Sequence, residues 1–483
     1  MEQAQVKKIF PDISLLALIG GALLILLASG MVAYSGAMAV FGIIAVSGLI
    51  YLAWKNLPTA LGVLAALVLL IPEGVGAWSY FSINLLGFNI RYIELVLLVI
   101  LGVWLFKLLI GSEKWRSYVT GTILISAPLI LWLAVASYHG ILNGSALTDF
   151  MNDIRSFSYY LVILPVITSL KSNEDRDKLL SAFIFGAAGF SILFFALSYI
   201  ESFVVGLMGL SFPGLFQELR FNFRNTSFFF LPWLLSIVFI KYETKPSLKI
   251  MYLLSLLAIT LGVILSQTRT LWAVLVACGI IFLVLSVWQK QMKWQTVLKS
   301  LALILIIVTL LISIPWVRDS KLYGQTLERV KTLTNINYAD DASYRFRVSV
   351  TPQIIEETKE NPVFGVGLGQ PVRIEYRNQF YDLPYIDNSY LMIAYKAGVP
   401  GLLAMLAFFL YYGWKLLVVV FKRKLDAKSL MIASALIASL LGFLTFGLST
   451  VMLTNYAATL LLGIIFGITE YLYYKSNHEQ ATT

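Results

Sequence analysis

An aspartate and an asparagine, Asp387 and Asn388, stand directly before a long apolar run, and nine residues separate them from the step Gly398-Val-Pro-Gly401. A carboxylate at the mouth of a helix can accept a proton from a hydroxyl group, and either side chain can cap the free N–H groups of the first turn. Lys396 lies inside the run, where its charge needs a carboxylate or a diphosphate as partner. This stretch is a candidate for proton transfer and phosphate binding.

Arginine supplies a second chemical signal. The positive-inside rule orients the chain and so assigns each basic residue to one side of the membrane. The inner side then holds 18 Lys and 3 Arg, and the outer side 4 Lys and 11 Arg. Guanidinium groups bind phosphates bidentately and tolerate partial burial. The alternative, equally weighted on counts alone, is that the arginines pair with loop carboxylates or lipid headgroups. Arg155, Arg224 and Arg269 lie at helix mouths beside apolar runs, which favours anion binding.

The sequence does not indicate a metal site. The histidines are His139 and His478, the single cysteine is Cys278, and no carboxylate cluster has a convincing ligand spacing. Asp149 and Asp153, spaced i,i+4, are expected to be solvated, with a weakly held divalent ion as the alternative. We therefore predict no metal and no cofactor. The favoured chemistry is transfer to a hydroxyl group, in which arginines stabilise a departing diphosphate and a carboxylate accepts the proton.

These residues are carried by a membrane protein. The chain has 483 residues, of which 59% are hydrophobic and 13% charged, and its mean hydropathy is +0.82. Runs of about 20 apolar residues, long enough to cross a bilayer, recur along it. We expect an all-α integral membrane protein with about 14 transmembrane helices. The predicted spans are 12–31, 36–54, 57–72, 91–110, 119–138, 157–170, 179–200, 227–241, 248–266, 270–288, 298–316, 389–420, 428–447 and 452–474.

The same rule orients the chain. Lys7 and Lys8 precede an uncleaved first helix and belong in the cytoplasm, and an even number of helices puts both termini there. The net charge of +10 follows from this topology and indicates no nucleic-acid partner. We predict helices 1–11 in residues 1–316, an extracytoplasmic loop at 317–386, helices 12–14 in 387–474 and a cytoplasmic tail at 475–483.

The long outer loop has internal order. Pro352 fits the first turn of a short helix at about 351–360, and Asn361-Pro362 ends it. The stretch "GVGLG" follows, with Gly365, Gly367 and Gly369. A nucleotide-binding loop is rejected because no strand precedes these glycines. Tight turns or a close approach of backbone to a ligand explain them better.

Taken together, these motifs resemble the O-antigen ligase and polymerase superfamily of bacterial membrane glycosyltransferases. Ligases of that family carry His, then Asn, Ser or Gln, nine residues and Gly-x-x-Gly, which corresponds here to the frame from Asp387 to Gly401. Arg347 and "NPVFGVGLG" match the family's arginine, short helix and Pro-x-x-Gly-x-Gly. "SQTRTLW" matches its Ser-x-x-Arg at Arg269, and "RNTSFFFLPWLL" resembles a helix start at Asn225.

The resemblance implies a GT-C-like fold with its active site on the outer face of the bacterial cytoplasmic (inner) membrane. The implied donor is an undecaprenyl-diphosphate-linked glycan, transferred without metal and with inversion to a glycan acceptor in the bilayer. The resemblance is also compatible with chain-length regulator proteins as partners. The predicted catalytic residues are Asp387 and Arg269. The predicted substrate-binding residues are Arg155, Arg224, Asn225, Arg347, Gly365, Gly367, Asn388, Lys396, Gly398 and Gly401.

One position departs from the ligase pattern. Asp387 stands where ligases have histidine, and an aspartate is a weaker base at neutral pH. Polymerases vary more at this position, so we favour a polymerase of oligosaccharide repeat units. The alternatives are a ligase that transfers glycan to a lipid or protein, a flippase for lipid-linked oligosaccharides, and a cell-wall polymerase of the shape, elongation and division type, which would normally have fewer helices.

Overall fold

The computed structural model describes residues 47–70, 82–85, 88–111, 113, 117–208, 228–266, 268–295 and 342–478. The predicted spans 12–31 and 298–316, most of span 36–54 and the start of the long loop lie outside these residues. Arg224 and Asn225 lie outside them too. The other candidate site residues are described.

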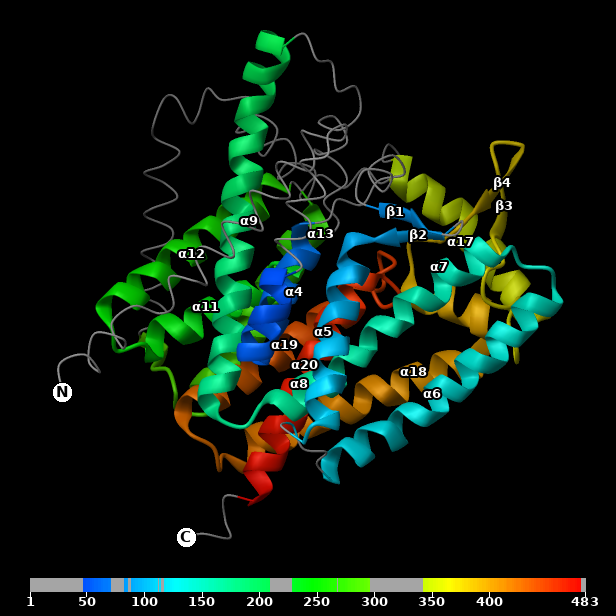
Figure 1. Ribbon diagram of the computed structural model, residues 1–483. Coiled ribbons are helices and arrows are strands. Elements are labelled where there is room, and N and C mark those ends of the chain that lie inside the picture. The colour runs from blue at the N-terminus through cyan, green and yellow to red at the C-terminus, as the bar shows by residue number, and fades with distance from the viewer. Residues whose placement is uncertain are drawn as a thin grey trace.

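The described chain is mostly helical, and its helices follow most of the predicted spans within a few residues (Figure 1). The helices are α4 (Leu57–Leu70), α5 (Tyr92–Leu109), α6 (Ser117–Leu142), α7 (Leu147–Ser158), α8 (Ile163–Ser169), α9 (Asn173–Met208), α11 (Phe230–Tyr242), α12 (Pro246–Leu265), α13 (Arg269–Trp288), α17 (Ala342–Glu360), α18 (Ser389–Lys422), α19 (Ala427–Phe446) and α20 (Tyr456–His478). Two antiparallel hairpins accompany them, β1 (Ser82–Leu85) with β2 (Phe88–Arg91) and β3 (Val372–Tyr376) with β4 (Gln379–Leu383).

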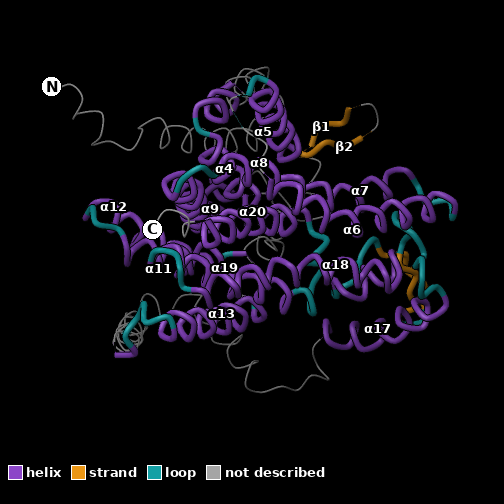
Figure 2. The backbone as a smooth tube through the Cα atoms, turned by 90° about the horizontal axis from the view of Figure 1, so that it is seen from below, coloured by secondary structure: helices purple, strands orange, loops and turns teal. Residues whose placement is uncertain are grey.

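Within the described ranges, six helices are long and apolar enough to cross a membrane: those in α6, α12, α13, α18, α19 and α20. Shorter apolar helices cover Leu57–Leu69 and Phe230–Tyr242. This confirms an all-α membrane protein, while the count of about 14 spans stays a prediction. The apolar window of α20 is 94% buried and that of α19 83%, against 22% for α6. In Figure 2, α20 lies between the α4 and α8 side of the bundle and the α18 and α19 side.

The predicted span 157–170 is helical as far as residue 169, but it is not one uninterrupted α-helix. Here the chain forms the amphipathic helix α7, a 3-10 turn at Tyr159–Val162 and the seven-residue helix α8. Pro165 lies in the first turn of α8, where its missing N–H is tolerated, so the chain begins a new helix there. The 3-10 turn and α8 pack along α20. None of the three segments is long enough to cross a bilayer alone.

The long loop contains more structure than predicted. Its helix, α17, begins at Ala342 rather than near 351, so Pro352 lies in its interior, and it ends at Glu360 before Asn361-Pro362 as predicted. The hairpin β3–β4 was not predicted. In β3 the buried Val372 and Ile374 alternate with exposed residues, which is the period-two pattern of a half-buried strand.

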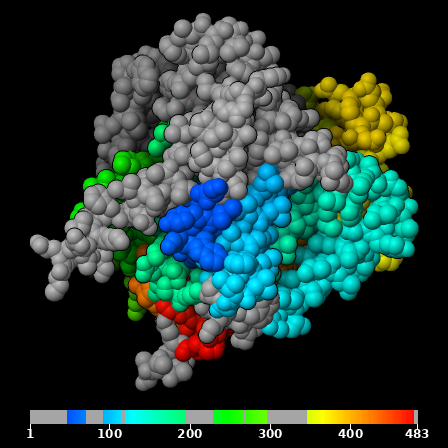
Figure 3. Space-filling view, viewed as in Figure 1, coloured from blue at the N-terminus to red at the C-terminus, as the bar shows by residue number. Residues whose placement is uncertain are grey.

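A second apolar cluster lies apart from the main core. Val350 and Ile354 of α17, Val372 and Ile374 of β3, and Met392 and Tyr395 of α18 form it together with Ile386. We call α17, β3, β4 and residues 386–397 the cap. In Figure 3 the yellow residues of α17 and the hairpin project beside the cyan residues of α6 and α7. The start of α18 therefore packs on both sides, with Met392 and Tyr395 in the cap and Ile393 and Ala397 in the main core.

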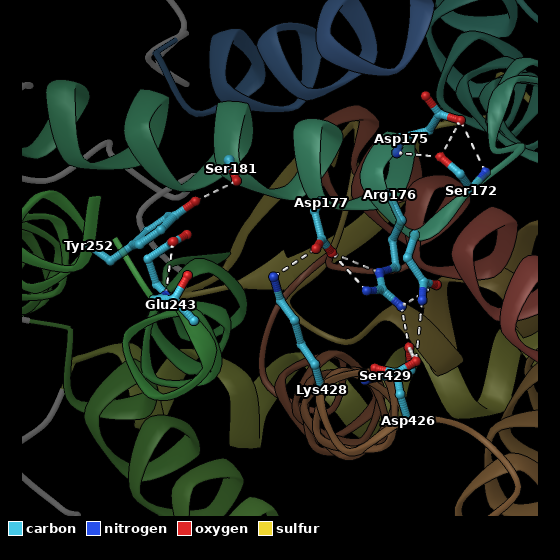
Figure 4. Close-up of polar contacts among 12 residues, drawn as sticks. Ser172, Asp175, Arg176, Asp177, Ser181, Glu243, Tyr252, Asp426, Lys428 and Ser429 are labelled. Atoms are coloured by element: carbon cyan, nitrogen blue, oxygen red, sulfur yellow. Dashed lines mark hydrogen bonds and ion pairs between the residues drawn. The ribbon is translucent and has the colours of Figure 1, made fainter. Parts of the chain in front are cut away.

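Four lysine-containing loops that were predicted to be cytoplasmic, at 171–178, 241–249, 289–293 and 422–428, meet at one end of the bundle. Arg176 donates to Ser429 Oγ at 2.5 Å, and Lys428 pairs with Asp177 at 2.7 Å (Figure 4). Tyr242 Oη donates to Gln291 Oε1 at 3.0 Å. We call this the lysine-rich end.

The opposite end carries the candidate site. Arg423 donates to the carbonyl of Trp288, the last residue of α13, and Lys422 of α18 donates to Asn477 of α20, so all three helices finish at the lysine-rich end. Their first residues, Arg269, Ser389 and Tyr456, consequently lie at the other end. We call it the Asp387 end.

Candidate functional site

The glycine step in the opening motif is a break in α18. Gly398 has φ 71° and ψ 174°, and Pro400 follows inside the helix. The break leaves carbonyl groups without their helical partners, and the loop after α17 satisfies them. Val366 N–H donates to Tyr395 O at 2.9 Å, and Gly367 N–H donates to Lys396 O at 3.0 Å. The two glycine motifs thus pack together through backbone hydrogen bonds. We call this contact between residues 362–369 and residues 395–399 the joint.

Other groups close the joint from both sides. Val399 N–H donates to Pro362 O at 2.8 Å, and Trp132 Nε1 of α6 donates to Ala397 O at 2.5 Å. Gly401 also packs on Trp132, because a Cβ there would lie 2.7 Å from its ring. Every described carbonyl from 395 to 397 therefore has a partner outside α18.

The glycines of the "GVGLG" loop make tight turns, as predicted, with positive φ at Gly365, Gly367 and Gly369. Their closest neighbours are the protein's own backbone. A Cβ on Gly365 would lie 2.5 Å from Tyr395 O, and one on Gly367 would lie 2.3 Å from Gly140 Cα. The loop is wedged between α18 and the α6–α7 connection, and its close approach is to the backbone of the chain itself.

The sequence left open whether Asp387 or Asn388 caps the first turn of α18. Asn388 is the N-cap of α18, and its Oδ1 accepts hydrogen bonds from the N–H groups of Tyr390 and Leu391 at 3.0 Å. Asp387 Oδ2 instead lies 3.2 Å from a terminal nitrogen of Arg347 on α17. Both side chains of this ion pair are partly exposed, at 29% and 41%. The Asp387 carboxylate therefore remains accessible and is not used as a cap.

Ser389 joins the start of α18 to the loop between α19 and α20. Its N–H donates to Gly447 O at 2.8 Å, and its Oγ donates to Thr450 O at 2.8 Å. The same Oγ accepts hydrogen bonds from the N–H groups of Met452 and Leu453. Ser389 is fully buried. Asp387 is consequently held by a fixed backbone at the mouth of the bundle.

Lys396 is paired inside the protein. Its Nζ lies 2.5 Å from Asp153 Oδ2 on α7 and 3.3 Å from Pro384 O. Asp153 Oδ2 also accepts the Gly369 N–H at 2.7 Å. The expectation that Asp153 is solvated is therefore wrong, because its carboxylate joins α7, the glycine loop and α18. The signal in the sequence was Lys396 itself, since a lysine deep in an apolar run requires a carboxylate partner.

Arg155 forms a second polar cluster at the Asp387 end. Its Nε lies 3.1 Å from Glu94 Oε1 at the start of α5, and Tyr159 Oη donates to the same oxygen at 3.3 Å. Burial lowers the pKa of Arg155, and the Glu94 carboxylate opposes this shift. The Arg91 guanidinium lies 4.7 Å from the centre of the Tyr456 ring.

Arg269 opens α13, directly after the N-cap Thr268. α13 and α19 run antiparallel, since Cys278 Sγ contacts Ala438 O at 3.1 Å while Trp288 lies by Arg423. Arg269 therefore lies toward the end of α19, where Gly447 accepts the Ser389 N–H. The described site residues thus share one end of the bundle, from α7, α13, α17 and α18.

No group of three or more His, Cys, Asp or Glu side chains in the described part of the chain is arranged to hold a metal ion. Three ion pairs lie at this end among the described residues: Arg155 with Glu94, Arg347 with Asp387, and Lys396 with Asp153. Such an arrangement can hold a polyanion and can place a carboxylate beside a hydroxyl group.

Comparison with known proteins agrees with this geometry. Residues 253–406 match a family model described as O-antigen ligase. The matched segment runs from α12 into α18 and includes Arg269, Arg347, the glycine loop, Asp387 and the break at Gly398. No curated protein matches the chain significantly. The resemblance in the motifs is confirmed for this segment: residues 253–406 are similar to the O-antigen ligase family.

Proposed function

We propose that the chain polymerises undecaprenyl-diphosphate-linked oligosaccharide repeat units on the outer face of the bacterial cytoplasmic membrane. The similarity of residues 253–406 to the O-antigen ligase family supports glycan transfer in general. One observation supports the specific mechanism. Asn388 takes the helix cap, so the Asp387 carboxylate is available beside Arg347 at the end of the bundle that also carries Arg155 and Arg269.

The proposed reaction is a single displacement at the sugar's anomeric carbon. The acceptor hydroxyl oxygen forms a bond to that carbon while the bond to the diphosphate oxygen breaks. Asp387 accepts the hydroxyl proton, and arginines take up the charge that develops on the departing undecaprenyl diphosphate. The Arg347 side chain is 41% exposed, so its guanidinium can also donate to a substrate oxygen.

A polymerase is favoured over a ligase because ligases carry histidine where this chain has Asp387. The ion pair with Arg347 orients the Asp387 carboxylate at the start of α18. The orientation of the site follows from the lysine-rich end, which belongs in the cytoplasm by the positive-inside rule. The Asp387 end then faces the outer leaflet.

The test is reconstitution of the full chain in vesicles with an undecaprenyl-diphosphate oligosaccharide donor. A ladder of longer lipid-linked glycans and free undecaprenyl diphosphate would support a polymerase. Single transfer of glycan to a lipid or protein acceptor would indicate the ligase. If the donor crosses the bilayer and no longer product forms, the proposal that the chain is a glycosyltransferase is wrong.

Arginine variants test the site within the same assay. Arg269→Ala should lower turnover by about 10²-fold or more, as for loss of one donor that stabilises transition-state charge. Arg269→Lys should lose less, because it keeps the charge but not the bidentate fork. Arg423→Ala at the lysine-rich end is the matched control and should leave turnover unchanged. Full activity of Arg269→Ala would refute this assignment. A chelator should have no effect on turnover.

A further inference from the structure

We infer that the buried ion pair between Lys396 and Asp153 is a positioning device for Asp387, which makes Asp153 and Lys396 positioning residues. The inference rests on the proposed function and assigns Lys396 a role other than direct contact with substrate. It follows from what the pair touches rather than from its charge alone.

Three segments meet at this pair. Lys396 Nζ lies 2.5 Å from Asp153 Oδ2 and 3.3 Å from the carbonyl of Pro384, which is three residues before Asp387. Asp153 Oδ2 also accepts the N–H of Gly369 at 2.7 Å. The ion pair thereby connects α7, the glycine loop and the short segment that ends at Asp387.

The Lys396–Asp153 ion pair is largely buried, which makes its separation costly. The Lys396 side chain is 7% exposed and that of Asp153 is 19% exposed, so loss of either partner leaves a buried charge without compensation. Lys396 also lies two residues before the break at Gly398, and its own carbonyl accepts the Gly367 N–H. Its backbone and its side chain therefore hold the same loop in place.

The pair also links the two polar clusters at the Asp387 end. Asp153 and Arg155 are two residues apart on α7, and Arg155 bonds to Glu94 on α5. A shift of α7 would consequently move Arg155 and the segment before Asp387 together. Displacement of reacting groups by about 1 Å can cost about 10²-fold in rate.

A second buried ion pair in the same helix supplies the control. Lys415 of α18 lies 2.7 Å from both carboxylate oxygens of Glu470 on α20, and both side chains are buried. This pair lies toward the lysine-rich end, since Lys415 is seven residues from Lys422, and it contacts no site residue. It matches the Lys396–Asp153 pair in chemistry and differs in place.

The experiment compares the variants Asp153→Asn and Glu470→Gln of the full chain in reconstituted vesicles, with the amount of folded protein measured for each. Asp153→Asn should lower kcat by about 10²-fold with little change in the KM for donor. Asp153→Glu, which keeps the charge, should recover turnover to within about tenfold of wild type. Glu470→Gln should keep wild-type kcat per folded molecule. Equal losses in Asp153→Asn and Glu470→Gln would overturn the inference and leave a purely structural role.

Hydrogen exchange gives a readout that does not depend on catalysis. The N–H groups of Val366, Gly367 and Gly369 are all bonded in the joint. Asp153→Asn should accelerate exchange in residues 362–370, and Glu470→Gln should not. If the wild-type protein does not lengthen the glycan, the proposed function is wrong. The hydrogen-exchange measurement still tests whether the Lys396–Asp153 pair holds the glycine loop in place. Unchanged exchange in Asp153→Asn would overturn it.

Discussion

Replacing Gly398 by alanine tests the joint between the two glycine motifs. The backbone there has φ 71° and ψ 174°, a region that is essentially restricted to glycine. An added Cβ would lie 2.0 Å from Val363 O and 2.5 Å from Val363 C. Both neighbours are backbone atoms, so no side-chain rotation can relieve the contact. The variant must either strain α18 or push the glycine loop away.

Each route has a similar cost. Holding a non-glycine residue in this conformation costs about 1–3 kcal/mol. Displacing the loop breaks the hydrogen bonds that Val366, Gly367 and Val399 donate, at about 1 kcal/mol each. We therefore expect a loss of about 3 kcal/mol in the free energy of unfolding. In a chain of this size, that lowers the thermal midpoint by on the order of 5 °C.

Thermal unfolding in detergent, followed by intrinsic fluorescence, measures the effect. Gly413→Ala is the control, because the nearest atom to its added Cβ is Leu440 Cδ2 at 3.7 Å and alanine favours the same helix by about 1 kcal/mol. Its midpoint should be unchanged or higher. If Gly398→Ala unfolds at the wild-type temperature and keeps amide protection at 362–370, the joint described above is wrong.

Further predictions concern three other positions. Arg347→Ala should reduce turnover by about 10-fold or more at saturating donor, with partial recovery in Arg347→Lys, because only arginine can orient Asp387 and bind a diphosphate oxygen together; equal rates for alanine and wild type would contradict this. Burial tends to raise the pKa of Asp426, but hydrogen bonds from Ser429 and the nearby Arg176 charge outweigh it and lower the pKa. A carboxylate with a depressed native pKa stabilises the fold above its unfolded pKa of about 3.9, and this contribution disappears as pH falls through the native value. The stability difference between wild type and Asp426→Asn should thus shrink below about pH 4, and a constant difference would refute the cause. Cys278 is buried and contacts Ala438 O, so a maleimide should label it only on unfolding; rapid labelling of folded protein would show that α13 and α19 do not pack as described.

Much of the helical architecture followed from apolar run length. Spans such as 389–420 and 428–447 were predicted within two residues because a bilayer demands about 20 apolar residues in succession. The same criterion could not show that at 157–170 a 3-10 turn divides the helical stretch, which packs against α20. Hydropathy does not distinguish a residue that faces lipid from one that faces a central helix.

The site was predicted in outline but not in its connections. The spacing of Asn388 and Gly398 was visible, but its meaning was not. Nine residues are the length of helix between the N-cap and the break, and this length packs against both the cap and the main core. The partners of Lys396 and Arg155 come from segments far away in the sequence. A single sequence carries no information on such pairs beyond the requirement that a buried charge has a partner. The hairpin β3–β4 was missed because each strand has only five residues and only β3 alternates between buried and exposed positions, while β4 is almost wholly exposed.

The most direct test of the account is glycan transfer by Asp387→Asn. Asparagine keeps the size of the side chain and an oxygen for Arg347, but it cannot accept the hydroxyl proton at neutral pH. In vesicles that contain equal amounts of folded protein and the same undecaprenyl-diphosphate donor, its single-turnover rate should fall by about 10²-fold or more. A rate within about threefold of wild type would show that Asp387 is not the base, and would contradict the mechanism proposed for this site.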